Sequence, residues 1–164
     1  MDPKRKKPNR SARSYALWLL GRQAYTGQQL KDRLLRRGYS AEEAADAVDY
    51  LQEINYVNDE AYAVQYVAMR SRAGHGPHKL SRDLKLRGID PDIVATAVAA
   101  VPYEVLLEQA QRLVRRRLQD KRLTDPKVRA GLYRYLLQRG YDYALIEEAV
   151  QKVIYCLDRD GLNS

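Results

Sequence analysis

A motif of two leucines and one glycine occurs three times along this chain of 164 residues. The leucines lie four positions apart and the glycine follows four positions later, which is the spacing of one helix face that ends at a glycine. The glycines are at positions 38, 88 and 140, and are therefore 50 and 52 residues apart. Such a period indicates tandem structural units. The copies are Leu30-x3-Leu34-x3-Gly38, Leu80-x3-Leu84-x3-Gly88 and Leu132-x3-Leu136-x3-Gly140.

Residues that start and stop helices divide each unit into three helices. In the first unit, Thr26 with Gln29 and Ser40 with Glu43 form two capping-box patterns on either side of Gly38. No stretch of any length alternates apolar and polar residues as a strand would. The predicted fold class is all-α. The expected organisation is a disordered basic tail at 1–12, three-helix repeats at 13–56, 57–101 and 102–155, and a disordered tail at 156–164.

Positive charge recurs on the middle helix of each unit. The chain has a net charge of +8, and each middle helix carries four cations against a single aspartate. Three copies of a basic helix predict an extended positive surface, which suits a long charged partner better than a small ligand. The alternative is that these are ordinary helix faces exposed to solvent.

Residue patterns for catalysis, metal binding or membrane insertion are absent from the sequence. The two histidines, His75 and His78, have no further metal ligands nearby, and Gly74-His75-Gly76 lacks the strand and the Gly-Lys of a nucleotide-binding loop. The longest uncharged apolar run, Ala16 to Gly21, is far too short to cross a bilayer. A single cysteine, Cys156, fits a reducing cytoplasm. We therefore expect a cytoplasmic protein that is not an enzyme, with no cofactor and no metal.

The thirteen tyrosines, in a chain without phenylalanine, raise the question of base stacking. Tyr133 and Tyr135 are the candidates because they flank Arg134 on a basic helix. Trp18 lies in an apolar run and is expected to be packed. Six further tyrosines fall at apolar positions and are expected in the core, namely Tyr15, Tyr39, Tyr62, Tyr66, Tyr103 and Tyr141.

The middle of the chain carries a dense series of motif residues. It contains Tyr56-Val57-Asn58-Asp59-Glu60-Ala61-Tyr62-Ala63, then Tyr66-Val67, Arg70-Ser71-Arg72, Gly74-His75-Gly76-Pro77, Leu80, Leu84 and Arg87-Gly88-Ile89. This series resembles the central signature of RecX regulatory proteins, and the segment from Leu19 to Gly38 is similar to the first repeat of that family. Two positions depart from the pattern: Asn58-Asp59 stands where paired acids are usual, and Tyr62 replaces a phenylalanine.

The resemblance covers about residues 13–155 and supplies the identity of the partner. It implies tandem three-helix repeats in an elongated, curved molecule that lies along the groove of the RecA recombinase filament on DNA. It further implies inhibition of strand exchange, ATPase and coprotease activity. We also expect a monomer. DNA, single-stranded or within the filament, is an expected second partner, and no membrane is involved. The residues expected to contact the partner are Arg36, Arg37, Arg70, Arg72, Lys79, Arg82, Lys85, Arg115, Arg116 and Arg134.

Two other functions stay open. Three-helix units can also read DNA directly, which would make the protein a helical DNA-binding regulator without a recombinase partner. A base reader needs polar side chains gathered at the exposed start of one helix, whereas the cations here are spread along the middle helices. A purely structural helical scaffold would make the charge pattern incidental.

Overall fold

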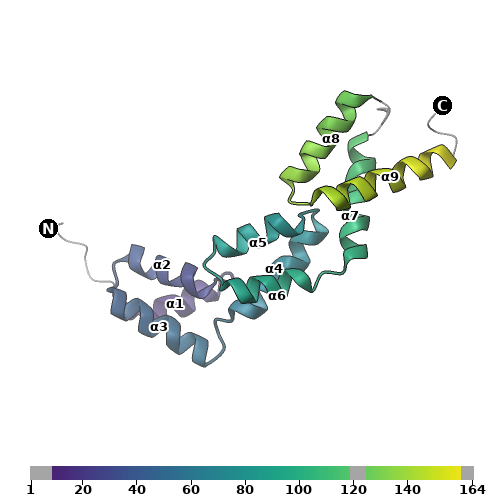
Figure 1. Ribbon diagram of the computed structural model, residues 1–164. Helices are drawn as coiled ribbons and strands as arrows, with labels where there is room; N and C mark the ends of the chain where they lie inside the picture. Colours follow the sequence, from purple (N-terminus) through teal and green to yellow (C-terminus); the bar gives the residue numbers. More distant parts are fainter. Residues whose placement is uncertain (1–8, 119–124, 160–164) are drawn as a thin grey trace. The chain divides into compact units, whose positions relative to one another are not determined.

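The computed structural model describes residues 9–118 and 125–159, and within these ranges the chain forms nine α-helices and no strand (Figure 1). The predicted all-α fold is confirmed. The helices are α1 (Ala12–Leu20), α2 (Gly27–Arg37), α3 (Ala41–Glu53), α4 (Asp59–Arg72), α5 (Pro77–Lys85), α6 (Pro91–Ala99), α7 (Tyr103–Leu118), α8 (Pro126–Gln138) and α9 (Tyr143–Arg159).

The predicted start signals act as expected. The side chains of Thr26 and Ser40 each accept a hydrogen bond from the backbone N–H three residues on. The side chains of Gln29 and Glu43 accept in turn from the backbone N–H groups of Thr26 and Ser40. Both capping boxes therefore satisfy amides that have no partner inside the helix. Gly38, at the end of α2, has a φ of 108°, a left-handed conformation that side chains with a Cβ rarely adopt.

Part of the expected N-terminal tail is ordered. Residues 1–8 of that tail lie outside the described residues, but Ser11 caps α1 and Ala12 is its first, buried residue. The hydroxyl of Tyr39 donates to the carbonyl of Arg10 at 2.8 Å, which ties this segment to the end of α2. At the other end of the chain, α9 continues to Arg159 and so includes residues placed in the C-terminal tail. Serine capping and burial of Ala12 explain why order begins before residue 13.

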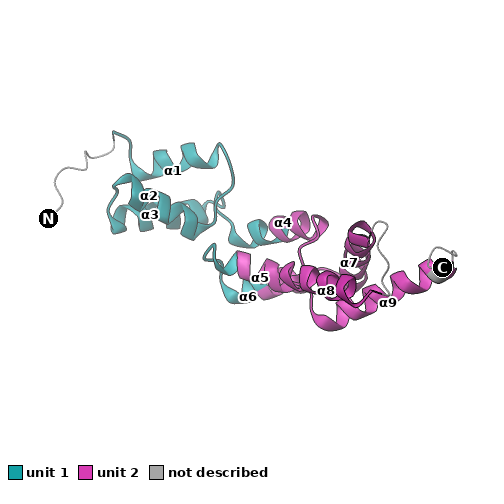
Figure 2. Ribbon diagram, turned by 90° about the horizontal axis from the view of Figure 1, so that it is seen from above, with its two compact units in different colours: residues 1–64, 84–94 teal, residues 65–83, 95–164 magenta. Residues whose placement is uncertain are grey.

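Figure 2 divides the chain into two compact units. Unit 1 comprises residues 1–64 and 84–94, and unit 2 comprises residues 65–83 and 95–164. The division passes through α4, α5 and α6, so the second expected repeat contributes to both units. Each unit has its own apolar core.

The core of unit 1 lies among α1, α2 and α3, and the core of unit 2 lies among α7, α8 and α9. Four leucines of the repeated motif lie in these two cores, and all four are no more than 2% exposed: Leu30 and Leu34 in unit 1, and Leu132 and Leu136 in unit 2. Burying one such side chain contributes on the order of 2 kcal/mol. The motif thus marks the inner face of each middle helix.

The expected core tyrosines separate into three groups. Tyr39, Tyr66 and Tyr141 are buried as predicted, and Tyr15 and Tyr62 are half-buried. The prediction is wrong for Tyr103, which is 46% exposed at the start of α7. Its hydroxyl donates to Glu148 at 2.6 Å, and this bond is the main reason that the pKa of Tyr103 rises to about 12.

In unit 1, the end of α5 meets the start of α2. Thr26 is fully buried there, and its hydroxyl donates to the carbonyl of Arg87 at 2.6 Å. Gly88 follows with a φ of 76°, and a Cβ at this position would overlap the side chain of Gln28. Glycine is required at this position both for the backbone conformation and for the close approach.

A second junction of the same kind lies in unit 2, where the end of α8 meets the start of α5. The N–H of Gly76 donates to the carbonyl of Arg139 at 2.7 Å, and the N–H of His78 donates to that of Gly140 at 3.0 Å. Gly140 has a φ of 88°, and a Cβ on it would overlap Lys79. In both junctions, the carbonyl end of one middle helix pairs with the amide end of the preceding one. Opposite ends of the two helix dipoles therefore meet, which is the favourable arrangement.

Among the described helices, none is by itself long and apolar enough to cross a membrane. The bent pair α6 and α7 meets that criterion by length and composition only when its two helices are taken together.

Candidate partner-binding surface

Unit 1 carries three of the predicted partner-binding residues. Arg36 and Arg37 are exposed in the last turn of α2, and Lys85 is exposed in the last turn of α5. Cations at a helix C-terminus are stabilised by the partial negative charge of the helix dipole. The side chain of Arg36 donates to the carbonyl of Asp32 at 3.2 Å, and the guanidinium of Arg37 lies 5.6 Å from the ring centre of Tyr15.

Unit 2 brings two of the predicted residues, Arg70 and Lys79, close to His75. The pKa of His75 is lowered, first by burial and then by the positive charges of Lys79, Arg70 and Arg139. Asp83 opposes this effect and forms an ion pair with Lys79 at 3.7 Å. An ion pair between residues four positions apart on one helix contributes at most about 1 kcal/mol. The result is a positive cluster beside the junction of α5 and α8.

Arg139 is the member of this cluster that the sequence did not single out. Its guanidinium donates to the carbonyls of Ala73 and Gly74, at 3.1 and 3.4 Å, just beyond the end of α4. Those carbonyls lie in the turn that directly follows Arg72, the last residue of α4. Arg139 is therefore a brace between α4 and α8. The only sequence signal for it is its place directly before the repeated glycine.

The remaining predicted residues of unit 2 are exposed on four helices. Arg72 is in the last turn of α4 and Arg82 is on α5. Among the described residues, their guanidinium groups form no ion pair, and the same holds for Arg115 and Arg116 on α7 and Arg134 on α8. These five guanidinium groups are thus exposed to solvent without a carboxylate partner in the described part of the chain.

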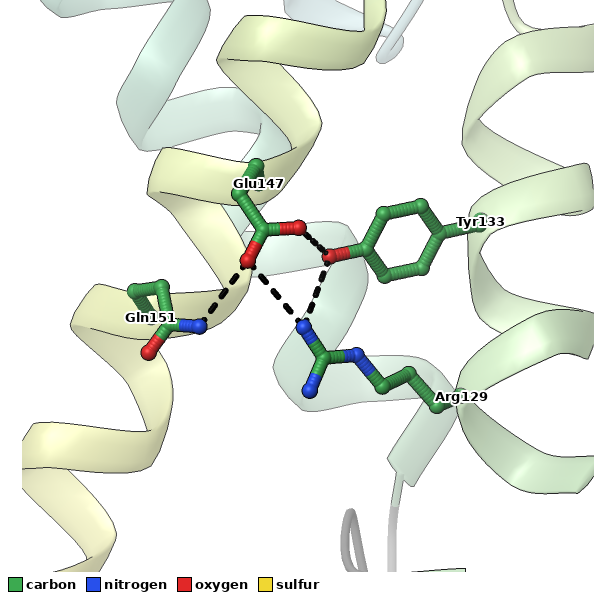
Figure 3. Close-up of polar contacts among 4 residues, drawn as sticks. All are labelled: Arg129, Tyr133, Glu147 and Gln151. Carbon is green, nitrogen blue, oxygen red and sulfur yellow. Dashed lines mark hydrogen bonds and ion pairs between the residues drawn. The ribbon is translucent and has the colours of Figure 1, made fainter. Parts of the chain in front are cut away.

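Arg129 of α8 is neutralised within the protein (Figure 3). Its guanidinium lies 3.1 Å from Glu147 of α9 and donates to the hydroxyl of Tyr133 at 3.3 Å. That hydroxyl donates in turn to Glu147, and Gln151 donates to the same carboxylate at 2.9 Å. The bonds from Gln151 and Tyr133 are the main causes of the lowered pKa of Glu147. The third middle helix therefore presents less charge than its composition suggests.

The same network decides the role of the two candidate stacking tyrosines. The hydroxyl of Tyr133 is engaged with Glu147, and its ring centre lies 5.4 Å from that of Tyr143. Tyr135 has the guanidinium groups of Arg117 and Arg139 each 5.0 Å from its ring centre. Both rings are half-buried and already have partners inside unit 2.

Trp18 is not packed, contrary to the sequence-based prediction. It is 41% exposed, and its ring stacks on that of Tyr15 with the centres 5.5 Å apart. The guanidinium of Arg22 lies 4.2 Å from the Trp18 ring centre. The spacing of three and four residues among Tyr15, Trp18 and Arg22 is the signal that could have placed them together on one helix face.

The chain matches three protein-family models in consecutive order. They are the first three-helix domain of RecX over residues 12–51, the second over residues 58–98 and the third over residues 104–150.

The chain is also similar to solved RecX structures. The crystal structure of RecX from Lactobacillus salivarius aligns with a TM-score of 0.80 at 21% identity, over 88% of this chain and 95% of that one. This likeness supports the fold.

Relatives with higher identity support the family assignment. The regulatory protein RecX of Mycobacterium sp. (strain JLS) is 33% identical over 151 residues, which are 87% of this chain and 82% of that protein. The protein of the same name from Actinobacillus pleuropneumoniae serotype 5b is 32% identical over 135 residues, which are 81% of this chain and 86% of that protein. With three domain matches in order and relatives of this similarity, the chain belongs to the RecX family of regulatory proteins, which are not catalysts.

Proposed function

We propose that this protein is a cytoplasmic, monomeric regulator that binds the RecA recombinase filament on DNA, along its groove, and inhibits strand exchange, ATPase and coprotease activity. The supporting observation is that the middle helix of each matched RecX domain exposes cations. These are Arg36 and Arg37 in the first domain, Arg82 and Lys85 in the second, and Arg134 in the third. Positive charge repeated along one chain suits a partner whose own surface repeats, as a filament's does.

Inhibition in this proposal needs no chemistry. Several weak contacts on one chain add through effective concentration, so neighbouring filament subunits are bound far better than one subunit alone. A protein that occupies the groove excludes both a second DNA molecule and a protein substrate. Each domain then contributes to affinity, and loss of one domain's cations weakens binding without abolishing it.

The test is the double charge reversal of Arg82 and Lys85 to glutamate in the full chain. Each exposed charge contact is worth on the order of 0.5 kcal/mol, and reversal adds a repulsion of similar size. Affinity for the recombinase filament on single-stranded DNA is therefore expected to fall about tenfold or more. Binding is measured by fluorescence anisotropy, and inhibition by recombinase ATP turnover.

A matched control makes the same change in net charge elsewhere. Lys152→Glu with Arg159→Glu reverses two exposed cations on α9. Circular dichroism checks the fold of this control, because Lys152 forms an ion pair with Glu148 at 3.0 Å. This control should bind the filament like the unmodified protein. If both double variants lose affinity equally, only overall charge matters and the assignment of the middle helices is wrong.

The second candidate is a DNA-binding regulator that needs no recombinase, and the exposed cations of the middle helices favour it equally. Here the Arg82 and Lys85 variant should lose affinity for naked DNA as much as for the filament. Each lost phosphate contact should also reduce the slope of log affinity against log salt by about 0.7 for single strands. Binding to the filament that greatly exceeds binding to naked DNA would favour the first candidate.

A further inference from the structure

Four planar side chains, from α1, the turn that follows it and the end of α2, form what we name the α1 surface: Tyr15, Trp18, Arg22 and Arg37. The guanidinium of Arg22 lies 4.2 Å from the Trp18 ring centre, and the Tyr15 and Trp18 rings are stacked with an angle of 21° between their planes. The guanidinium of Arg37 lies 5.6 Å from the Tyr15 ring centre. The surface belongs entirely to unit 1.

The exposure of Trp18 needs an explanation because the chain has one tryptophan and leaves 41% of it in contact with solvent. Exposing an indole forgoes the apolar burial that a core position would give, on the order of 2 kcal/mol. The helix that carries Trp18 is itself well packed, since Ala16 and Leu19 on another face of α1 are buried in the core. The indole is therefore held in place and presented to solvent.

The segment of sequence that contains α1 carries charge of one sign. From Pro3 to Lys31 the chain contains no aspartate or glutamate, while Arg10, Arg13 and Arg22 lie in or beside α1. The guanidinium of Arg13 lies 4.3 Å from the ring centre of Tyr50 of α3, which adds another aromatic and cation pair to unit 1. Aromatic rings interleaved with cations favour a ligand that carries both flat π-systems and negative charge.

We infer that the α1 surface is a binding site for single-stranded nucleic acid, which shares only Arg37 with the cations of the middle helices. A base stacks on the indole of Trp18 in place of the Arg22 guanidinium, and that guanidinium moves to the adjacent phosphate. Stacking of bases on aromatic side chains tolerates any sequence, and arginine can serve both the base and the backbone. An acidic protein partner would use the cations but has no group equivalent to a base for the exposed indole.

The inference stands independently of filament binding, and the experiment uses naked DNA with no recombinase present. Trp18 is the sole tryptophan, so its fluorescence reports directly on the site. Titration of the full chain with oligothymidylate should quench this fluorescence. An abasic deoxyribose-phosphate strand of equal length carries the same charge without bases, and should bind more weakly and quench little.

The informative variant is Trp18→Leu, and its control is Tyr56→Leu. Tyr56 is 64% exposed between α3 and α4 and lies outside the α1 surface. Trp18→Leu should weaken binding of oligothymidylate, read by anisotropy, by at least about fivefold, because loss of one stacked base costs at least about 1 kcal/mol. Its salt dependence should stay the same, since no charge is removed. Tyr56→Leu should bind like the unmodified protein.

Unchanged affinity of Trp18→Leu, or equal binding of the abasic strand, would overturn the inference. A fluorescence change that appears only when recombinase is added would also overturn it, and would mark the surface as a protein contact. Circular dichroism checks the folding of the variant. If Trp18→Leu does not fold, Arg22→Ala replaces an exposed residue and must weaken binding and flatten the salt dependence for the inference to hold.

Discussion

Thr26→Val tests whether the junction between α5 and α2 stabilises the protein. Valine keeps the shape of threonine and removes only the hydroxyl, which performs two tasks. It accepts from the N–H of Gln29 at 3.2 Å as the cap of α2, and it donates to the carbonyl of Arg87 at 2.6 Å. Ser40 offers the matched comparison, because its hydroxyl accepts from the N–H of Glu43 in the same capping box and is exposed.

The expected magnitudes follow from these contacts. Loss of a capping hydroxyl costs about 1 kcal/mol. Loss of the bond to the Arg87 carbonyl adds about 1 to 1.5 kcal/mol, because Thr26 is fully buried and water cannot replace its hydroxyl there. Thr26→Val should therefore lower the free energy of unfolding by about 2 to 2.5 kcal/mol, and Ser40→Ala by about 1 kcal/mol. For a chain of this size, the first value corresponds to a fall in Tm of about 4–10 °C.

The assay is urea unfolding followed by circular dichroism at 222 nm, with a thermal scan as a second reading. The quantity that decides the matter is the difference between the two variants, because it removes the capping contribution that they share. If Thr26→Val costs no more than Ser40→Ala, the bond to Arg87 contributes nothing and the account of the junction fails.

Three further changes probe other features. Gly140→Ala should destabilise the protein by more than the roughly 1 kcal/mol of its left-handed backbone alone, because the added Cβ overlaps Lys79; a Tm equal to that of the unmodified protein would contradict the close approach. Gly131→Ala should raise the free energy of unfolding by about 0.5 to 1 kcal/mol, because Gly131 lies inside α8 with open space around its Cβ position; a lower urea midpoint would refute this. The lowered pKa of His75 means that the folded protein binds a proton less readily than the unfolded chain, so stability is lost as the pH falls below about 6.5 toward the lower pKa of the folded state. Tm should fall more between pH 7.5 and 5.5 for the unmodified protein than for His75→Gln. Equal falls in Tm would show that protonation of His75 does not affect stability.

Local chemistry explains why the helices could be predicted from the sequence. A capping box such as Thr26 with Gln29 involves neighbouring residues only, so its pattern and its structure coincide. The leucines four positions apart likewise report which face of a helix is buried. These signals need no knowledge of how helices pack.

The candidate site was harder to predict because its details depend on residues far apart in the chain. Arg139 braces the end of α4 across 66 positions, and Arg129 meets Glu147 only because α8 and α9 lie together. Charge counting treats both arginines like the exposed Arg134, although they are engaged inside unit 2. The exposure of Trp18 is of the same kind, since an apolar run does not reveal which of its members the neighbouring helices leave uncovered.

The two junctions also bear on whether the array could be lengthened. At the start of α5, the N–H of His78 is satisfied by the carbonyl of Gly140, whereas at the equivalent position of α8 the N–H of Lys127 is satisfied by the carboxylate of Asp125. The residue directly before the helix is Gly76 for α5 and Asp125 for α8. The carboxylate of Asp125 would repel the carbonyl oxygen of an incoming helix. The start of α8 is thus closed to a further middle helix. A chain engineered with a fourth repeat would first need, in place of Asp125, a residue that admits a carbonyl oxygen, such as the threonine at the start of α2 or the glycine at the start of α5.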